Sequence, residues 1–533
     1  MMKKAIKKLL AALLAVAMVC AMAIPAFAGT EGDITKWHSF SAFQIFKGKV
    51  EGNDIKDFKI SNVEWGSNID PDNFLPQLKG ADTIGPLFAN ANSARDVLEV
   101  ISQWHNSDAN SIAFARFVCH YLYPDANAKP KPAVEGGGGS DHIHFDEAGY
   151  YLVVDTTPFS HGDFDHAYNS FLLMVTHEDW NIPITPKAEK PSVKKEVFDN
   201  QDGTSTGDFG SSADHAINEK FQFKLTATLP ASTDHAYDYY DTYAVCFKDT
   251  LSEGITYDGP DSVVIKSNNN THDTTIDPSK YDIDTKNLEN QNYFEVNIHD
   301  VKACAKDAGF DLNDGATITF TYTAHLNEKA TVNTTSGPTD NKNSVQLQYS
   351  NNPRPGDYWG TTPKSEVYVF TYQLNNTKRA ETENGTPLPG AGFKLYSDKA
   401  YEHEVKLYKE GNFYYPIKNA PDKTPVEMKS ADDGTFNVRG LDAGTYYLKE
   451  TTTPADFTPC SVIPPVTITA NHNGNHVELD SSKLSTTIIN KKAGGITLPS
   501  TGGIGTTLFY VVGGGLMVAA IVLLVTKKRM ENK

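Results

Sequence analysis

The chain has 533 residues and a formal net charge of −18 at pH 7, with 66 acidic against 48 basic side chains. This acidity argues against nucleic acid as a partner, because phosphate binding needs a basic surface. The length allows about three domains of ordinary size between the two ends. The five cysteines show no CxxC and no metal-ligand spacing, so neither a disulfide framework nor a metal or cofactor is expected.

Residues 1–28 have the pattern of a signal peptide. Four lysines between residues 3 and 8 precede an apolar stretch at 9–24, and Ala26, Phe27 and Ala28 supply a small-x-small cleavage site. The alternative is a permanent membrane anchor, but the apolar run is short and polar sequence follows at once. We therefore expect an exported protein.

The first predicted domain, residues 29–187, combines strands and helices. Strands are expected at 40–46 and 150–155, and a helix is expected over 93–123, where apolar residues from Val97 to Trp104 share one face. A proline-bearing junction with the sequence WNIPITPK closes this domain and ends at Lys187. The fold predicted here is mixed α+β.

The second predicted domain, residues 188–360, alternates apolar and polar residues in the pattern of a β-sandwich. Val193 and Val197 flank Lys195 on one face of the opening strand, so a strand that buries the valines also buries this lysine. Asn343 has the same position relative to the apolar residues of the closing strand. Asp249 is the candidate acid of this domain, and the choice between Lys194 and Lys195 stays open.

The third predicted domain, residues 361–495, repeats this arrangement. Its opening strand, expected at 368–378, places Lys378 in phase with apolar residues, and its closing strand places Asn490 in phase with Ile488. Glu450 is in phase with Tyr446 and Leu448 and is the candidate acid.

Two lysines and two asparagines thus stand where apolar residues belong. One interpretation places each polar head in water at a strand end, which is common for lysine. In the other, each buried amine attacks its asparagine carboxamide, releases ammonia and leaves an isopeptide bond. Burial would supply the neutral nucleophile, and the buried acid would shuttle protons.

The C-terminal residues 496–533 contain a short pentapeptide, an apolar segment at 508–525 and a basic tail. This order resembles the cell-wall sorting signal that sortases read. The resemblance implies cleavage between Thr501 and Gly502, with Thr501 held as a thioester and then passed to an amine. The pentapeptide consists of Leu498, Pro499, Ser500, Thr501 and Gly502.

Further segments resemble CnaB-type domains and sortase-assembled shaft pilins. Residues 446–451 match the E-box YxLxET, residues 343–353 look like the closing strand NxVxLxYSNNP, and residues 38–50 are similar to the N-terminal pilin domain. The resemblance implies tandem Ig-like, CnaB-type sandwiches with Lys195–Asn343 and Lys378–Asn490 bonds. It departs from the family after the E-box, where Thr453 replaces the usual alanine.

The sequence WNIPITPK resembles the pilin motif of shaft pilins. The resemblance implies that Lys187 is the amine that accepts Thr501 of another copy. Two features complicate this assignment: the family usually has tyrosine where this chain has Thr185, and Lys190 is a nearby competitor.

Together these patterns predict a secreted structural subunit of a covalent pilus on the cell wall, which is a substrate of sortase, supports adhesion and is not itself an enzyme. The expected partners are sortase, other copies of the chain, minor pilins, peptidoglycan and host surface ligands. The alternative is a monomeric LPxTG adhesin or minor pilin that carries the same sorting signal.

Overall fold

The computed structural model describes most of the chain between residues 39 and 493 and a short C-terminal stretch. The described residues are 39–51, 59–104, 108–135, 142–156, 167–168, 171–175, 180–183, 188–200, 207–233, 235–269, 273–356, 359–493, 516–525 and 527–528. The signal peptide, Lys187 and the sorting pentapeptide all lie outside these residues.

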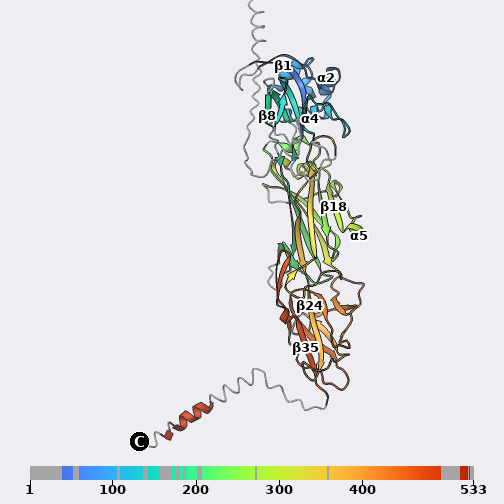
Figure 1. The fold of residues 1–533 in the computed structure, drawn as a ribbon, viewed down its shortest axis with the longest axis vertical. Coiled ribbons are helices and arrows are strands. Elements are labelled where there is room, and N and C mark those ends of the chain that lie inside the picture. The colour runs from blue at the N-terminus through green and yellow to red at the C-terminus, as the bar shows by residue number, and fades with distance from the viewer. Residues whose placement is uncertain are drawn as a thin grey trace, which may run out of the picture. The chain divides into compact units, whose positions relative to one another are not determined.

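The chain divides into two compact units, coloured from blue to red along the sequence in Figure 1. The first unit comprises Met1–Thr371 together with Ala470–Glu478, and the second comprises Tyr372–Thr469 and Leu479–Lys533. The first unit contains both the mixed N-terminal part and the first β-sandwich.

The N-terminal part is built on an antiparallel sheet with the order β2-β1-β5-β7, and β3 pairs with β1. Its helices contribute Phe74, Val97 and Phe114 to the core, which confirms the prediction of a mixed domain. The elements are β1 (Phe40–Glu51), β2 (Lys59–Trp65), α2 (Pro71–Gly80), α3 (Ala94–Ile101), α4 (Ala109–Leu122), β3 (Val134–Glu135), β5 (Gly149–Asp155) and β7 (Phe171–Val175).

The single helix expected over 93–123 is wrong, because two helices occupy this stretch. Ser93 caps α3 by accepting a hydrogen bond from the backbone N–H of Asp96, and α3 ends at Ile101. Asp108, a residue type favoured at helix starts, precedes α4. Apart from Trp104, residues 102–108 are polar, and this polar run was the available signal for the break.

The first β-sandwich packs two sheets face to face. One has the order β11-β10-β13-β19-β15-β16; the other has the order β12-β23-β21-β14-β18-β17, with β22 on β21. The strands of the first sheet are β10 (Ser192–Phe198), β11 (Phe209–Gly210), β13 (Lys220–Leu229), β15 (Ile255–Ser267), β16 (Thr274–Thr275) and β19 (Ala316–Leu326). Those of the second are β12 (Ser212–Asp214), β14 (Val245–Leu251), β17 (Tyr281–Asp284), β18 (Tyr293–Ile298), β21 (Lys342–Ser350), β22 (Trp359–Thr361) and β23 (Ser365–Phe370).

Buried and partly exposed side chains alternate along these strands, and this alternation determines which residues form the core of the sandwich. Every second residue of β19 is buried, including Ile318, Phe320 and Tyr322, as the period of two requires. Beside this sandwich, β20 (Gly337–Pro338) pairs with β34 (His476–Leu479), which pairs with β33 (Ala470–Asn473).

The second unit contains two further sheets. One has the order β27-β28-β30-β24-β35; the other has the order β26-β25-β31-β32, with β29 on β25. The strands are β24 (Tyr372–Ala380), β25 (Gly392–Tyr396), β26 (Glu404–Val405), β27 (Leu407–Glu410), β28 (Phe413–Pro416), β29 (Met428–Lys429), β30 (Val438–Leu441), β31 (Gly444–Thr452), β32 (Val466–Ile468) and β35 (Ser485–Asn490). The predicted mainly β fold class is confirmed.

The single strand expected at 368–378 is also wrong. The residues form β23, which pairs with β21 of the first sandwich, and then β24, which belongs to the second unit. Phe370, Thr371 and Tyr372 are buried in succession, so the alternation of one continuous strand is interrupted at Thr371.

Two remaining features bear on the sequence predictions. Cys119, Cys246, Cys304 and Cys460 form no disulfide with one another. Within the described residues, no helix is long and apolar enough to cross a bilayer. The apolar segment expected at 508–525 lies partly outside those residues, and its described part, 516–525, is helical.

Candidate functional site

The first candidate site lies between the two sheets of the first sandwich. Lys195 on β10 and Asp249 on β14 form an ion pair in which both side chains have no exposed surface. Lys194 points the other way, is 70% exposed and pairs with Glu196. The structure therefore selects Lys195 as the inward-facing lysine and brings it to the acid that the sequence suggested.

Asn343 on β21 completes this group through a residue that the sequence reasoning missed. Its Nδ2 donates to the hydroxyl of Tyr322 (2.5 Å), and that hydroxyl donates to Asp249 Oδ1 (3.0 Å). Lys195 Nζ also donates to the Tyr322 oxygen (3.2 Å). One phenol thus links the amine, the acid and the amide.

The carbonyl oxygen of Asn343 is the one atom of this group left without a hydrogen bond, although it is fully buried. Leaving a buried acceptor unsatisfied costs about 1–3 kcal/mol. An amide carbonyl that is shielded from water and unengaged is free to be polarised by a nearby acid proton.

Burial shifts the protonation of the pair toward its neutral form. Loss of water lowers the pKa of Lys195 from its ordinary value to about 8, although the Asp249 carboxylate opposes this shift. Burial also raises the pKa of Asp249, against the effect of the lysine and of hydrogen bonds from Tyr322 and Asn343. Both pKa shifts favour the neutral amine and the neutral acid more than the same groups in water do.

The second candidate site lies inside the second unit, where β24 and β35 run parallel to each other. Lys378 Nζ donates a hydrogen bond to Asn490 Oδ1, and both residues are buried. Glu450 on β31 accepts from Asn490 Nδ2 through Oε1 (2.7 Å), and the same oxygen is 3.5 Å from Lys378 Nζ. One carboxylate oxygen thus faces both the nucleophile and the nitrogen that would leave.

The surrounding chain holds this arrangement in place. The second oxygen of Glu450 accepts from the backbone N–H of Cys460 (2.6 Å), and the Lys378 ammonium lies over the ring of Phe393, 5.4 Å from its centroid. Gly434, at φ +82°, approaches so closely that a Cβ there would lie 2.4 Å from the Lys378 carbonyl oxygen. Burial lowers the pKa of Lys378.

The two sites therefore share a lysine, an acid and an asparagine in a dry interior, but they arrange them differently. In the second unit the acid and the amide are linked directly, whereas in the first sandwich the Tyr322 hydroxyl is an additional bridge between them. Tyr322 is in phase with Ile318 and Phe320 along β19, so alternation alone assigns it to the core. A hydroxyl among inward-facing residues, on the same sheet as a buried lysine, was the available signal.

The structure leaves two groups of predicted site residues undescribed. The sortase acceptor Lys187 and the cleavage residues Leu498 to Gly502 lie outside the described residues. Lys190, the competing acceptor, is described and exposed.

Comparison with family models identifies the class of protein. Residues 490–532 match the LPXTG cell wall anchor motif, so this is a protein of the cell wall surface. Residues 374–483 match the prealbumin-like fold domain SpaA, which covers most of the second unit, including Lys378 and Glu450. A search of curated proteins found no match.

Solved structures of pilins resemble the chain at low identity. The T6 backbone pilin of Streptococcus pyogenes is 15% identical, with a TM-score of 0.49, and the match covers 87% of this chain and 97% of the pilin. The major pilin SpaD of Corynebacterium diphtheriae is 18% identical, with a TM-score of 0.43 and coverage of 87% and 94%. A C-terminal fragment of the Streptococcus agalactiae pilin GBS80 is 23% identical, with a TM-score of 0.41 and coverage of 56% and 99%.

Proposed function

We propose that this protein is the structural subunit of a covalently polymerised pilus, joined by sortase and stabilised by one isopeptide bond in each of its two sandwich regions. The observation that carries the proposal is the contact of Lys378, Glu450 and Asn490 in a domain that precedes a cell wall anchor motif. The chain acts as a substrate rather than an enzyme, because each internal reaction occurs once within its own domain.

In the second unit, the reaction begins with the neutral amine of Lys378. Nζ attacks Cγ of Asn490, a new C–N bond forms, and the bond from Cγ to Nδ2 breaks. One amine proton passes through Glu450 Oε1 to Nδ2, which leaves as ammonia. The 3.5 and 2.7 Å contacts of this one oxygen support the transfer.

In the first sandwich, Lys195 attacks Asn343 by the same chemistry. Asp249 takes the ammonium proton of Lys195, which burial favours in both partners, and passes it to the leaving nitrogen. It then accepts a second proton from the attacking nitrogen, so the amide and the ammonia are neutral and Asp249 ends protonated. Tyr322 holds the acid and the amide in register. It acts as a positioning residue, because it neither attacks nor leaves.

Polymerisation joins Thr501 near the C-terminus of one copy to Lys187 at the end of the first domain of another. Sortase cleaves after Thr501 and transfers the acyl group to Lys187 of the next copy, and a final transfer attaches the chain to peptidoglycan. Minor pilins and host surface ligands are further partners in this proposal, and adhesion is its outcome. Each internal bond would keep the domain closed under tension along the shaft.

Polymerisation is tested by expressing the protein with its sortase and separating cell wall extracts on denaturing gels. A ladder of covalent multimers is expected for the wild type and for Lys190→Ala, a matched control near the same junction. Lys187→Ala should give only the monomer. A ladder that persists in Lys187→Ala would remove that lysine from its role, and a wild-type monomer linked to the wall would favour the adhesin alternative.

The internal bonds are tested by intact mass. The wild-type protein should be lighter than its sequence by two molecules of ammonia, while Lys378→Met and Lys195→Met should each restore one. Peptide mapping should recover the Lys378 and Asn490 peptides as one branched species. Full sequence mass in the wild type would refute both bonds.

A further inference from the structure

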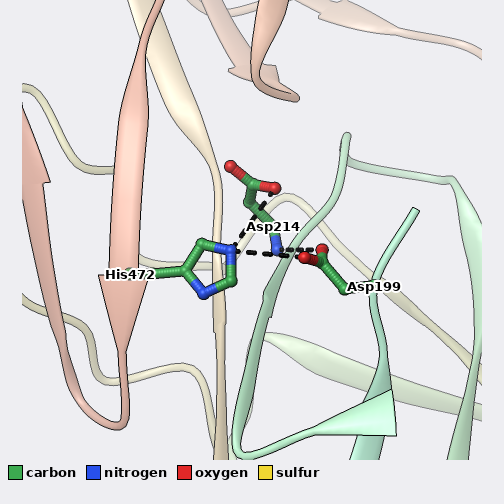
Figure 2. A group of neighbouring side chains, drawn as sticks. All are labelled: Asp199, Asp214 and His472. Carbon is green, nitrogen blue, oxygen red and sulfur yellow. Dashed lines mark hydrogen bonds and ion pairs between the residues drawn. The ribbon is translucent and has the colours of Figure 1, made fainter. Parts of the chain in front are cut away.

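A second buried polar cluster lies in the first unit, apart from the cross-linking residues. It contains Asp199, which follows β10, Asp214 at the end of β12, and His472 on β33 (Figure 2). Asp199 and Asp214 are 6% and 2% exposed, and the His472 side chain is 13% exposed. The cluster is therefore buried but keeps a narrow approach from solvent at the imidazole.

Two hydrogen-bond contacts orient the side chains of the cluster toward one another. Asp199 Oδ1 accepts the backbone N–H of Asp214 (3.1 Å), which leaves Oδ2 facing the imidazole. His472 Nδ1 is 2.9 Å from Ser212 Oγ, and its ring stacks on Phe370. If Nδ1–H donates to the serine, Nε2 presents a lone pair to both carboxylates. Figure 2 shows this ring nitrogen directed at Asp199 and Asp214.

Three acceptor atoms that face each other in this way favour a proton or a cation between them. A carboxylate only accepts hydrogen bonds, and so does an imidazole nitrogen that carries no proton. A proton on Nε2 would draw the partners to about 2.7–2.9 Å, the length of a charge-assisted hydrogen bond. The observed distances from Nε2 are 3.5 Å to Asp199 Oδ2 and 3.8 Å to Asp214 Oδ1.

These separations fit ligands arranged around one metal ion. With metal–ligand bonds of about 2.0–2.1 Å, two ligands of a tetrahedral zinc ion lie about 3.3 Å apart. All three ligand atoms lie within 4.8 Å of one another, so small side-chain rotations close the site. A divalent ion would also neutralise two buried carboxylates, which are costly without compensation.

We propose that Asp199, Asp214 and His472 bind a divalent transition-metal ion, with zinc as the best fit to an imidazole and two carboxylates. Ser212 acts as the outer partner that orients the imidazole, and a water molecule fills the fourth position through the exposed edge. The prediction of no metal rested on spacing along the sequence. It could not find this site, because Ser212 and His472 are 260 positions apart.

The ion would fasten residues 470–478 to the first sandwich. This segment stands between two stretches of the second unit in the sequence, yet it belongs to the first unit. Its short strands β33 and β34 form a three-stranded sheet with β20, and a metal bond there would add a fixed point to the hydrogen-bond ladder.

The test is a zinc titration of the untagged, full-length protein, followed by native mass spectrometry and thermal unfolding. We expect one zinc ion per chain and a rise in unfolding temperature that chelation reverses. His472→Gln should abolish both effects, and Ser212→Ala should weaken binding roughly 10- to 100-fold, as outer-shell changes do. His299→Gln, which alters a 58% exposed histidine paired with one aspartate, serves as the matched control.

Two further measurements keep the result interpretable. Without zinc, the unfolding temperature of His472→Gln should be close to that of the metal-free wild type, which excludes a folding defect. Crystals grown with zinc should show anomalous scattering between the three side chains. Absence of a bound ion in the wild type, or unchanged zinc affinity in a folded His472→Gln variant, would overturn the proposal.

Discussion

Replacing Glu450 by glutamine separates the chemistry of the second unit from its packing. The substitution keeps the size of the side chain and an oxygen that can accept from Asn490 Nδ2, but it removes the group that carries the proton. We therefore expect Lys378 and Asn490 to remain unreacted in a folded domain.

The loss of stability expected for Glu450→Gln follows from the length of chain that the isopeptide bond closes into a loop. Lys378 and Asn490 are 112 positions apart, and a cross-link over a loop of this length restricts the unfolded chain by about 5 kcal/mol in the loop-entropy treatment used for disulfides. For a domain near 100 residues, such a loss lowers the unfolding temperature by roughly 20 °C.

The assay combines intact mass with calorimetry. Glu450→Gln should be heavier than the wild type by one ammonia, apart from the small mass change of the substitution itself, and should unfold earlier. Glu410→Gln changes an exposed carboxylate on β27 and should match the wild type in both measurements. Complete loss of ammonia in Glu450→Gln would refute the role of the acid, and an unchanged unfolding temperature without the bond would refute the entropy argument.

Three further predictions test the surroundings of the two bonds. Tyr322→Phe should slow bond formation in the first sandwich roughly 10- to 100-fold through misalignment, and a mass time course during refolding would show an unchanged rate if this is wrong. Asn343→Ala leaves Lys195 as an amine with a pKa of about 8 in the folded protein, against an ordinary 10.5. Between these pH values the folded chain binds fewer protons than the unfolded chain, so the free energy of unfolding should rise by roughly 3 kcal/mol as the pH increases through that window. Denaturant titrations of the variant and the wild type at several pH values would measure this rise. Gly434→Ala should destabilise by roughly 1–3 kcal/mol more than Gly390→Ala, because both glycines have a positive φ but only the first has a backbone oxygen within 2.4 Å of the added Cβ, and equal unfolding temperatures would contradict this.

The positions of the lysines and asparagines could be predicted because a strand has a period of two. Once the valines beside Lys195 face the core, the lysine must face it as well, and the same holds for Asn343. The direction of a side chain in a strand is local information. The acids were found in the same way, since Glu450 shares a face with Leu448.

The contacts across the sandwich could not be predicted in this way. That Tyr322 reaches both Asp249 and Asn343 depends on how two sheets are stacked, and alternation within one strand carries no such information. The cluster of Asp199, Asp214 and His472 depends on the return of a distant segment to the first unit. Similarly, the end of β23 was missed because buried residues continue through Thr371, and the end of α3 was missed because Trp104 extends the apolar face of the helix into a polar stretch.

The parallel pairing of β24 and β35 has a consequence for damage from outside the cell. Once Lys378 and Asn490 are joined, every residue between them belongs to a closed ring, and the fibre is continuous through the side-chain amide. Hydrolysis of a peptide bond in an exposed turn of that ring, such as the one before β26, opens the ring without severing the fibre. In the proposed pilus, a chain cross-linked in this way would stay attached at both ends after a protease cuts such a turn.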